Sequence, residues 1–344
     1  MQSYAVCFLI ALAASYILTP MAIKLAIKIG AMDAPDARKV HREPIPRMGG
    51  LAIYLAFVAA VLVSVPMSQQ VMGLLIGGTV IVAVGILDDL YQLAAKVKLA
   101  GQIVAAAVLL FFDIRIDWVM NPFSGELIYF DWLAIPITIF WIVGLTNTVN
   151  LIDGLDGLAA GVSTIAAVSI LFIAADMGIV TVALVLAALA GSAVGFLKYN
   201  MNPAKVFMGD TGSMFLGYTL AAVSIIGAVK SAATIALIVP IVALGLPILD
   251  TAFAILRRKL SGEPIFKPDK GHLHHRLLAM GMSQKQAVWL MYGISCCLGI
   301  SAFILTEVSV SVGCGILAAL LILAVVGARK IGVLKADRRR SAQS

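Results

Sequence analysis

The residues best suited to chemistry are carboxylates that lie at the ends of long apolar runs. Asp88 and Asp89 end one such run, in the segment GILDDLYQLAAKVK. Two adjacent carboxylates repel each other unless a cation or a metal ion stands between them. Lys96 and Lys98 follow one to two helical turns later, where they are placed to face a phosphate. The alternative interpretation is a helix end that is merely solvated.

A second polar segment, NTVNLIDGLDGLAAG, contains an amide and two carboxylates at regular spacing. Asn150, Asp153 and Asp156 follow one another at intervals of three, so they line one side of the segment if it is helical. Gly154 and Gly157 remove side chains beside them, which allows a ligand or a backbone to come close. The alternative is a polar turn between two membrane spans.

Asp210 stands just before another apolar run, in the segment NMNPAKVFMGDTGSMFLG. A helix that begins here would offer free backbone N–H groups and a positive dipole end, which suit a phosphate or diphosphate. A lone carboxylate between Gly209 and Gly212 also suits a hard cation such as Mg²⁺. The alternative is an aspartate that only caps the helix.

Histidines gather in the longest polar segment, which contains KGHLHHRLL with His272, His274 and His275. Three histidines can bind zinc, but the carboxylates and amides of the other segments favour magnesium. With a lysine and an arginine beside them, the histidines are better suited to contact a diphosphate.

A basic segment, DARKVHREPIPRMGG, supplies further candidates for phosphate binding. It contains Arg42 and Arg47 and ends in two glycines that open the next apolar run. Basic residues collect on cytoplasmic loops for topological reasons alone, so a pure topology signal is the alternative here.

The composition indicates that lipid surrounds the elements that carry these segments. Of the 344 residues, 61% are hydrophobic and 12% are charged, whereas a soluble domain is about half apolar and about a quarter charged. A spanning helix needs roughly 20 mostly apolar residues, and the chain contains about 11 candidate runs. They lie near 3–27, 48–66, 70–87, 99–112, 132–149, 158–176, 179–197, 212–229, 233–255, 285–305 and 308–328.

The distribution of basic residues predicts the orientation. With the N-terminus outside, the inner segments 28–47, 88–98, 198–210, 256–284 and 329–344, together with Lys24 at the first boundary, hold all but three of the 25 basic residues, and one of those three, Lys285, directly follows the segment 256–284. The segment 150–157 also falls on the inner side. We therefore expect an all-α polytopic membrane protein with a cytoplasmic C-terminus, a single transmembrane catalytic domain over 1–328 and a basic tail over 329–344. Residues 113–131 predict a short hairpin outside the membrane.

Carboxylates, amides, histidines and basic residues that converge at one membrane face are what phosphoryl transfer with a divalent metal requires. A secondary transporter is the main alternative from another class. Transporters place ionisable groups near the bilayer midplane, often in repeated halves, whereas no internal repeat is visible here. Asp250, in PILDT, comes nearest to a charge within a span. The basic tail lacks a folded module, so nucleic acid is not an expected partner.

Five motifs together resemble the polyprenyl-phosphate N-acetylhexosamine-1-phosphate transferase family. They are PRMGG (46–50), ILDDLYQL (86–93), NLIDGLDG (150–157), VFMGDTGS (206–213) and KGHLHHRLL (270–278). The form His-x-His-His resembles the branch that transfers GlcNAc-1-phosphate and initiates teichoic acid, O-antigen and related glycans. The alternative is the branch that uses UDP-MurNAc-pentapeptide, which carries an uninterrupted histidine triplet.

The resemblance implies a bacterial inner-membrane enzyme, active on the cytoplasmic face, that converts UDP-GlcNAc and undecaprenyl phosphate to undecaprenyl-diphosphate-GlcNAc and UMP. It also implies Mg²⁺, with Mn²⁺ as a substitute, and a homodimer. Asp210 is the expected metal ligand, together with Asp153, and Asn150 and Asn200 are expected to line the nucleotide site. Catalytic roles are expected for Asp88, Asp89, Asp153, Asp156, His272, His274 and His275, and phosphate contacts for Lys96, Arg42 and Arg47.

Direct attack by the lipid phosphate is the favoured mechanism. A phosphomonoester has a second pKa of about 6, so little proton remains to be removed at neutral pH. An aspartate nucleophile that forms a covalent phospho-sugar intermediate is the alternative.

Overall fold

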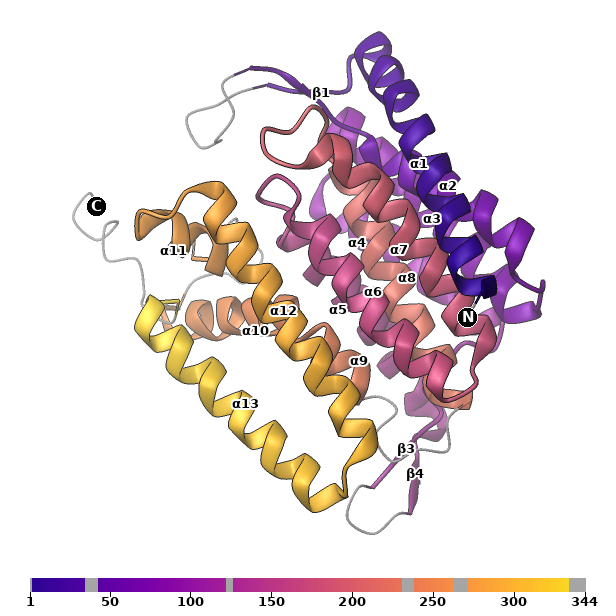
Figure 1. The fold of residues 1–344 in the computed structure, drawn as a ribbon, viewed down its shortest axis with the longest axis vertical. Helices are drawn as coiled ribbons and strands as arrows, with labels where there is room; N and C mark the ends of the chain where they lie inside the picture. The colour runs from indigo at the N-terminus through magenta and orange to yellow at the C-terminus, as the bar shows by residue number, and fades with distance from the viewer. Residues whose placement is uncertain (1, 35–42, 122–125, 231–237, 263–270, 334–344) are drawn as a thin grey trace.

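The computed structural model describes residues 2–34, 43–121, 126–230, 238–262 and 271–333, and these form a helical bundle with two short hairpins (Figure 1). The first half contains α1 (Gln2–Ile29), β1 (Met32–Asp33), β2 (Ile45–Pro46), α2 (Gly49–Ser64), α3 (Gln69–Tyr91), α4 (Ala95–Phe111), β3 (Trp118–Met120), β4 (Leu127–Tyr129), a 3₁₀ turn (Asp131–Leu133) and α5 (Ala134–Leu151). The second half contains α6 (Leu158–Asp176), α7 (Val180–Asn200), α8 (Gly209–Lys230), α9 (Ile238–Ala243), α10 (Gly245–Leu260), α11 (Leu273–Ala279), α12 (Gln284–Glu307) and α13 (Val310–Ile331).

The predicted all-α polytopic membrane architecture is confirmed. In the described part of the chain, eight helical stretches are long and apolar enough to cross a membrane, and α2 is a shorter apolar helix. Such segments must be helical because lipid offers no hydrogen-bond partner to the backbone. The predicted number of about 11 spans and their orientation stay predictions.

One predicted span, near 233–255, is not continuous. A turn at Leu244 separates α9 from α10, and α10 crosses behind α12 in Figure 1. Pro240 and Pro247 each lie in the first turn of a helix, where the missing N–H group costs no hydrogen bond. Two short helices therefore replace the expected long one, and residues 231–237 lie outside the described residues.

Small residues allow the helices at the centre to pack closely. Gly191 and Gly195 of α7 lie against the backbone of α1 beside Phe8 and Leu12, so a Cβ at either glycine would strike a carbonyl oxygen. Two small residues four apart are typical of close helix packing in membranes. Helix α8 is almost wholly buried among its neighbours, whereas α13 has few buried residues and presents an apolar surface suited to lipid.

The two ends of the bundle differ. The hairpin predicted within residues 113–131 is confirmed, since β3 pairs antiparallel with β4, with Trp118 opposite Tyr129. Its place outside the membrane stays a prediction. A second antiparallel pair, β1 with β2, was not predicted. Figure 1 shows this second hairpin near the turns that follow α5 and α7, at the end of the bundle opposite β3 and β4. The polar segments of the sequence analysis lie at the end that carries the β1–β2 hairpin.

Candidate active site

A cavity of about 930 Å³ opens among the polar segments at this end of the bundle. Its walls come from the β1–β2 hairpin, the turn after α5, the segment between α7 and α8, the first turn of α8, and residues of α11 and α12. Predicted functional residues that line it are Arg47, Asn150, Asp153, Asp156, Asn200, Asp210 and His275. Polar segments that are far apart in the sequence therefore meet at one site, as predicted.

The start of α8 is fixed by backbone hydrogen bonds to the chain between β2 and α2. Phe207 N donates to Pro46 O at 2.8 Å, and two bonds of 2.9 Å join the first residues of α2 to the same segment. Gly209 then turns the chain with a φ of 70°, a left-handed conformation that favours glycine. This arrangement sets Asp210, in the first turn of α8, on the same cavity wall as Arg47.

Asp89 caps α8 from a neighbouring helix. Its Oδ1 accepts the N–H of Asp210 at 2.9 Å, and its Oδ2 accepts the N–H of Thr211 at 3.2 Å and the Thr211 hydroxyl at 2.6 Å. Arg47 Nη2 lies 3.4 Å from Asp89 Oδ1. The expectation that the N–H groups at this helix start are free for a phosphate is therefore wrong, because a buried carboxylate already occupies two of them.

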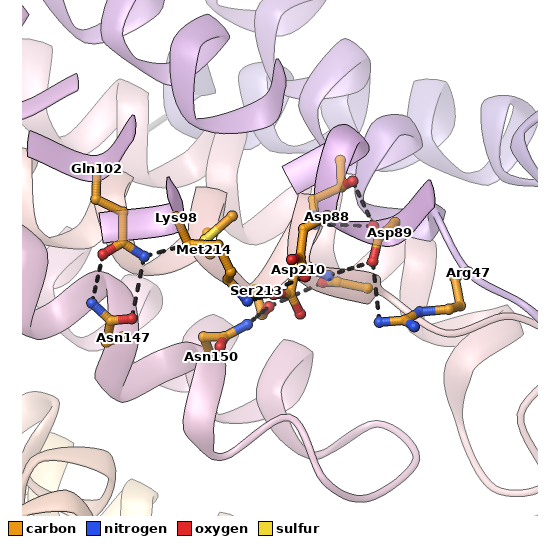
Figure 2. Close-up of polar contacts among 12 residues, drawn as sticks. Arg47, Asp88, Asp89, Lys98, Gln102, Asn147, Asn150, Asp210, Ser213 and Met214 are labelled. Carbon is orange, nitrogen blue, oxygen red and sulfur yellow. Dashed lines mark hydrogen bonds and ion pairs between the residues drawn. The ribbon is translucent and has the colours of Figure 1, made fainter. Parts of the chain in front are cut away.

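Asp88 points away from Asp89 and shares a lysine with Asp210 (Figure 2). Lys98 Nζ lies 3.2 Å from Asp88 Oδ2 and also pairs with Asp210 Oδ2. Each carboxylate of the Asp88–Asp89 pair thus has a cation of its own, Lys98 in the first turn of α4 for Asp88 and Arg47 for Asp89. Lys96, which was expected to contact phosphate, is exposed and lies outside the cavity lining. Helical geometry explains the difference, because residues two apart point to different sides of α4.

The two lysines of α4 provide a matched test. Lys98→Met should lower kcat by at least about 100-fold, because it leaves two carboxylates unneutralised where charge gathers on the substrate. Lys96→Met should change the rate less than about twofold, because an exposed charge contributes little. The measurement is the initial rate of transfer by each purified variant. Equal losses in the two variants would contradict the assignment.

Asp153 and Asp156 lie in a turn, since α5 ends at Leu151, so the helical arrangement that would line them up with Asn150 on one side is not formed. The turn still directs both aspartates to the cavity. Within the described residues, the Asp153 carboxylate makes no hydrogen bond or ion pair. Burial, together with the negative charges of Asp210 and Asp89, raises the pKa of Asp153 to about 7. A cation at this position would relieve that repulsion.

The raised pKa makes a prediction about stability. The folded pKa of about 7 lies above the unfolded value of about 3.9, so the native state binds more protons between these values and loses stability as pH rises through them. In buffer without divalent cations, the melting temperature of Asp153→Asn should therefore be higher than that of wild type. The difference between the two melting temperatures should grow from about pH 4 to pH 7. The difference should then stay constant at higher pH.

The control for this experiment is Asp131→Asn. Asp131 is exposed near the β3–β4 hairpin, and its positive φ suits asparagine equally well. This variant should have the same melting temperature as wild type at every pH. A melting difference for Asp153→Asn that does not change with pH would contradict the assigned pKa.

Asn200 and Asp156 hold the cavity wall through their own hydrogen bonds. Asn200 Oδ1 accepts the N–H of Gly157 at 3.0 Å, and its Nδ2 donates to Val206 O at 2.9 Å. Asp156 Oδ2 accepts from Asn202 Nδ2 at 2.8 Å and from Ala204 N at 3.1 Å. The Asn200 amide therefore hydrogen-bonds to the protein at both ends while it lines the cavity, and the expectation that it contacts the nucleotide stays a prediction.

The three histidines have different surroundings. His275 lines the cavity, whereas His272 is buried and its Nδ1 lies 2.9 Å from Asp250 Oδ2. His274 is buried against Gly154, and burial, followed by the charge of His275, lowers the pKa of His274 to about 3, so it is neutral. The expectation that all three contact diphosphate or sugar is corrected, because the structure places only His275 of the three in the cavity lining.

The remaining candidates divide between the site and the undescribed chain. Arg47 lies between Asp33 and Asp89, 3.4 Å from each, and faces the cavity. Arg42 lies outside the described residues. Phe207 and Lys205 also line the cavity with Asp210, although the sequence pattern had not marked them as candidates. Their presence in the same segment as Asp210 was the available signal.

A pair of amides links the helices beneath the cavity. Gln102 Nε2 donates to Asn147 Oδ1 at 3.2 Å, and Asn147 Nδ2 donates to Gln102 Oε1 at 2.7 Å. Asn150, one turn after Asn147, donates to Ser213 Oγ of α8 at 2.8 Å. Figure 2 shows the amide pair beside Lys98. These bonds join α4, α5 and α8 at the level of the site.

The donor set fits a magnesium ion that is completed by substrate. In the part of the chain that the structure describes, no group of three or more histidine, cysteine or acidic side chains is arranged to hold a metal alone. Magnesium in phosphoryl-transfer sites is usually bound by one or two carboxylates, waters and substrate phosphates. Asp210 and the uncommitted Asp153 on one cavity wall meet this requirement.

Comparisons with known proteins place the chain among sugar-phosphate transferases by similarity. Residues 71–228 match Glycosyl transferase family 4. The chain is 45% identical over 306 residues to a probable undecaprenyl-phosphate N-acetylglucosaminyl 1-phosphate transferase of Bacillus subtilis (strain 168), which covers 89% of this chain and 86% of the relative. It is 37% identical to a decaprenyl-phosphate N-acetylglucosaminephosphotransferase of Mycolicibacterium smegmatis, over 81% of this chain and 76% of the relative.

A phospho-N-acetylmuramoyl-pentapeptide-transferase of Shouchella clausii is also similar, with 31% identity over 87% of this chain and 98% of the relative. Identity is thus higher to the two N-acetylglucosamine enzymes than to this pentapeptide enzyme. The five motifs and the similarity across most of each relative's length lead to one conclusion. The chain belongs to the polyprenyl-phosphate N-acetylhexosamine-1-phosphate transferase family, within glycosyl transferase family 4.

Proposed function

We propose that the protein transfers GlcNAc-1-phosphate from UDP-GlcNAc to undecaprenyl phosphate, which yields undecaprenyl-diphosphate-GlcNAc and UMP. The observation that carries this proposal is one cavity, at the end of a membrane helix bundle, that brings together Asp210, Asp153, Arg47 and His275. The relatives named above support the donor and the acceptor by their names. Such a reaction would be the first membrane step of a cell-envelope polysaccharide.

The position of the cavity suits one soluble and one lipid substrate. It lies where apolar helices end, so a polyprenyl chain can stay in the bilayer while its phosphate reaches the cavity. The basic residues of the segments at this end support a position on the cytoplasmic face, where nucleotide sugars are available. The membrane in this proposal is the bacterial inner membrane. Cysteine-specific labelling of a Lys205→Cys variant in intact cells, with and without permeabilisation, tests that placement.

In the proposed reaction, an oxygen of the lipid phosphate forms a bond to the β-phosphorus of UDP-GlcNAc. The bond from that phosphorus to the bridging oxygen breaks, and UMP leaves with the electron pair. The attacking phosphate is mostly dianionic at neutral pH, so no residue has to remove a proton. Lys98 holds Asp88 and Asp210 in place, and Arg47 offers a cation to the diphosphate.

Magnesium is part of the proposal. Asp210 and Asp153 would hold the ion, and His275 of α11 would contact the diphosphate or the sugar. When bound, Mg²⁺ would spread the negative charge that gathers on the diphosphate. Removal of divalent cations with a chelator should abolish transfer, and Mn²⁺ should restore it in part. Full activity in the chelated enzyme would contradict this component. The homodimer stays a prediction.

Direct attack has a covalent alternative in which an aspartate is the nucleophile. Asp89 is unsuited to that role because both its oxygens accept hydrogen bonds from α8. Exchange of labelled UMP into UDP-GlcNAc in the absence of lipid, or isolation of a phospho-sugar adduct, would support the covalent route instead.

One assay separates the candidate donors. Purified protein is incubated with Mg²⁺, a short polyprenyl phosphate and either radiolabelled UDP-GlcNAc or UDP-MurNAc-pentapeptide. We expect lipid-linked product and UMP from UDP-GlcNAc alone. Product from the pentapeptide donor would move the protein to the other branch, which the 31% identity to the Shouchella clausii enzyme makes the second candidate. Absence of product from both, with transport into vesicles, would favour a transporter.

A further inference from the structure

Asp250 is a buried carboxylate of α10 that the proposed reaction does not use. It is 3% exposed, and both its oxygens are engaged at the start of α11. Oδ2 lies 2.9 Å from His272 Nδ1, and Oδ1 accepts the N–H of Leu273 at 2.8 Å. Because a carboxylate only accepts, the ring proton of His272 must lie on Nδ1. One side chain thus fixes both the position and the tautomer of His272.

The three histidine rings connect this carboxylate to the cavity. The rings of His272 and His274 are stacked, with centroids 5.9 Å apart and planes inclined by 8°. The His274 ring contacts that of His275, with centroids 4.2 Å apart. His274 also packs on Gly154, in the turn that carries Asp153. A displacement of His272 would therefore be passed to His275 and to the turn through direct contacts.

A second residue of α10 also holds the start of α11 by hydrogen bonds. Arg257, two turns after Asp250, donates from Nη1 to Gly271 O at 3.1 Å and also to Val333 O, just beyond α13. Helix α10 therefore holds three consecutive residues, Gly271 to Leu273, from one side. We call these contacts of Asp250 and Arg257 the α10 brace. They hold the start of α11 in place, where the N-cap residue His272 makes no capping hydrogen bond with its side chain.

We infer that Asp250 is a positioning residue for transfer: through His272 it fixes the start of α11 so that His275 faces the cavity. This inference rests on the proposed function, because His275 is assigned there to the substrate. A buried charge is costly unless hydrogen bonds satisfy it, and here two donors do so. An asparagine could accept only one of the two bonds, since its amide nitrogen would face another donor.

The test compares Asp250→Asn with Thr251→Val in the full-length protein. Thr251 is the next residue of α10, and its buried hydroxyl has no hydrogen-bond partner in the described part of the chain. Asp250→Asn should lower kcat by about 10- to 100-fold with little change in donor KM, because a small misplacement of a catalytic group has costs of this order. Thr251→Val should keep wild-type kcat and KM.

A double-mutant cycle distinguishes positioning from general destabilisation. If Asp250 acts through the histidine segment, Asp250→Asn should cost almost nothing further in a His275→Ala background. The same fold-loss in both backgrounds would overturn the inference. His272→Ala removes the other partner of Asp250 and should show the same coupling to His275, which keeps the test available if Asp250→Asn does not fold.

A readout without substrate separates this inference from the proposed function. The rate at which diethyl pyrocarbonate modifies His275, followed by mass spectrometry, should change in Asp250→Asn and stay at the wild-type value in Thr251→Val. An unchanged rate in both would contradict positioning, whatever the donor is. If wild type showed no transfer but the rate of His275 modification changed in Asp250→Asn, the positioning of His275 by Asp250 would be supported and the proposed transfer reaction would be refuted.

Discussion

Replacement of Asp210 by asparagine should lower kcat by about 100- to 1000-fold, the range found when one charge-stabilising group is removed from an active site. Asparagine keeps the size of the side chain but removes the charge that pairs with Lys98 and that a divalent cation requires. The substitution also leaves Asp88 as the single acidic partner of Lys98 among the contacts described. Initial rates of UMP release and of lipid product formation measure the effect.

The matched control is Asp117→Asn at the other end of the bundle. Asp117 forms an ion pair with Arg115 at 2.9 Å, and both side chains are more than 40% exposed, so the pair contributes at most about 1 kcal/mol. This variant should transfer at the wild-type rate. If Asp210→Asn retained activity within about threefold of wild type, the charge of Asp210 would not serve the electrostatic role assigned to it.

The second large effect concerns the backbone contacts that hold the site. A Cβ added at Gly50, in the first turn of α2, would collide with the backbone of Gly212 in α8. Backbone atoms of two packed helices cannot move aside as a flexible side chain can, so Gly50→Ala should destabilise the fold by at least about 3 kcal/mol. We expect loss of monodisperse protein and of transfer together.

Gly144→Ala provides the control, because it is the same substitution in another spanning helix. No atom lies within 4 Å of a Cβ added at Gly144 of α5, and alanine favours helix over glycine by about 1 kcal/mol. This variant should melt at or above the wild-type temperature. Gly85→Ala, whose Cβ would meet the Thr211 backbone, should behave like Gly50→Ala. Normal folding of both site variants would show that the helices at the start of α8 can separate.

The sequence contained enough information to predict the fold class. Runs of apolar residues long enough to cross a bilayer leave the backbone no alternative to helices, so the all-α membrane architecture follows from composition and length. Even so, the sequence did not predict that the span near 233–255 is interrupted, because hydropathy does not register the turn at Leu244 between α9 and α10. The β1–β2 hairpin was missed because each strand is only two residues long.

The sequence predicted which segments form the candidate site better than it predicted which of their side chains face the cavity. Carboxylates are rare enough in an apolar chain that Asp88, Asp153 and Asp210 stood out, and the structure brings them to one end of the bundle. Lys96 is exposed whereas Lys98 pairs with Asp88 and Asp210, and of the three histidines the structure places His275 alone in the cavity lining. Both differences concern which side of an element faces its neighbours, and the sequence near those residues does not specify it.

Local sequence thus determined which stretches are helices in lipid and which polar residues interrupt them, because solvation acts on each residue whatever its partners. Only the tertiary structure decided which polar atoms are committed to the protein and which remain for a substrate. Lys98 meets Asp210 across 112 positions of sequence, and Asp89 caps Thr211 across 122. Such contacts depend on how α3, α4 and α8 pack together, and that packing is a property of the whole bundle.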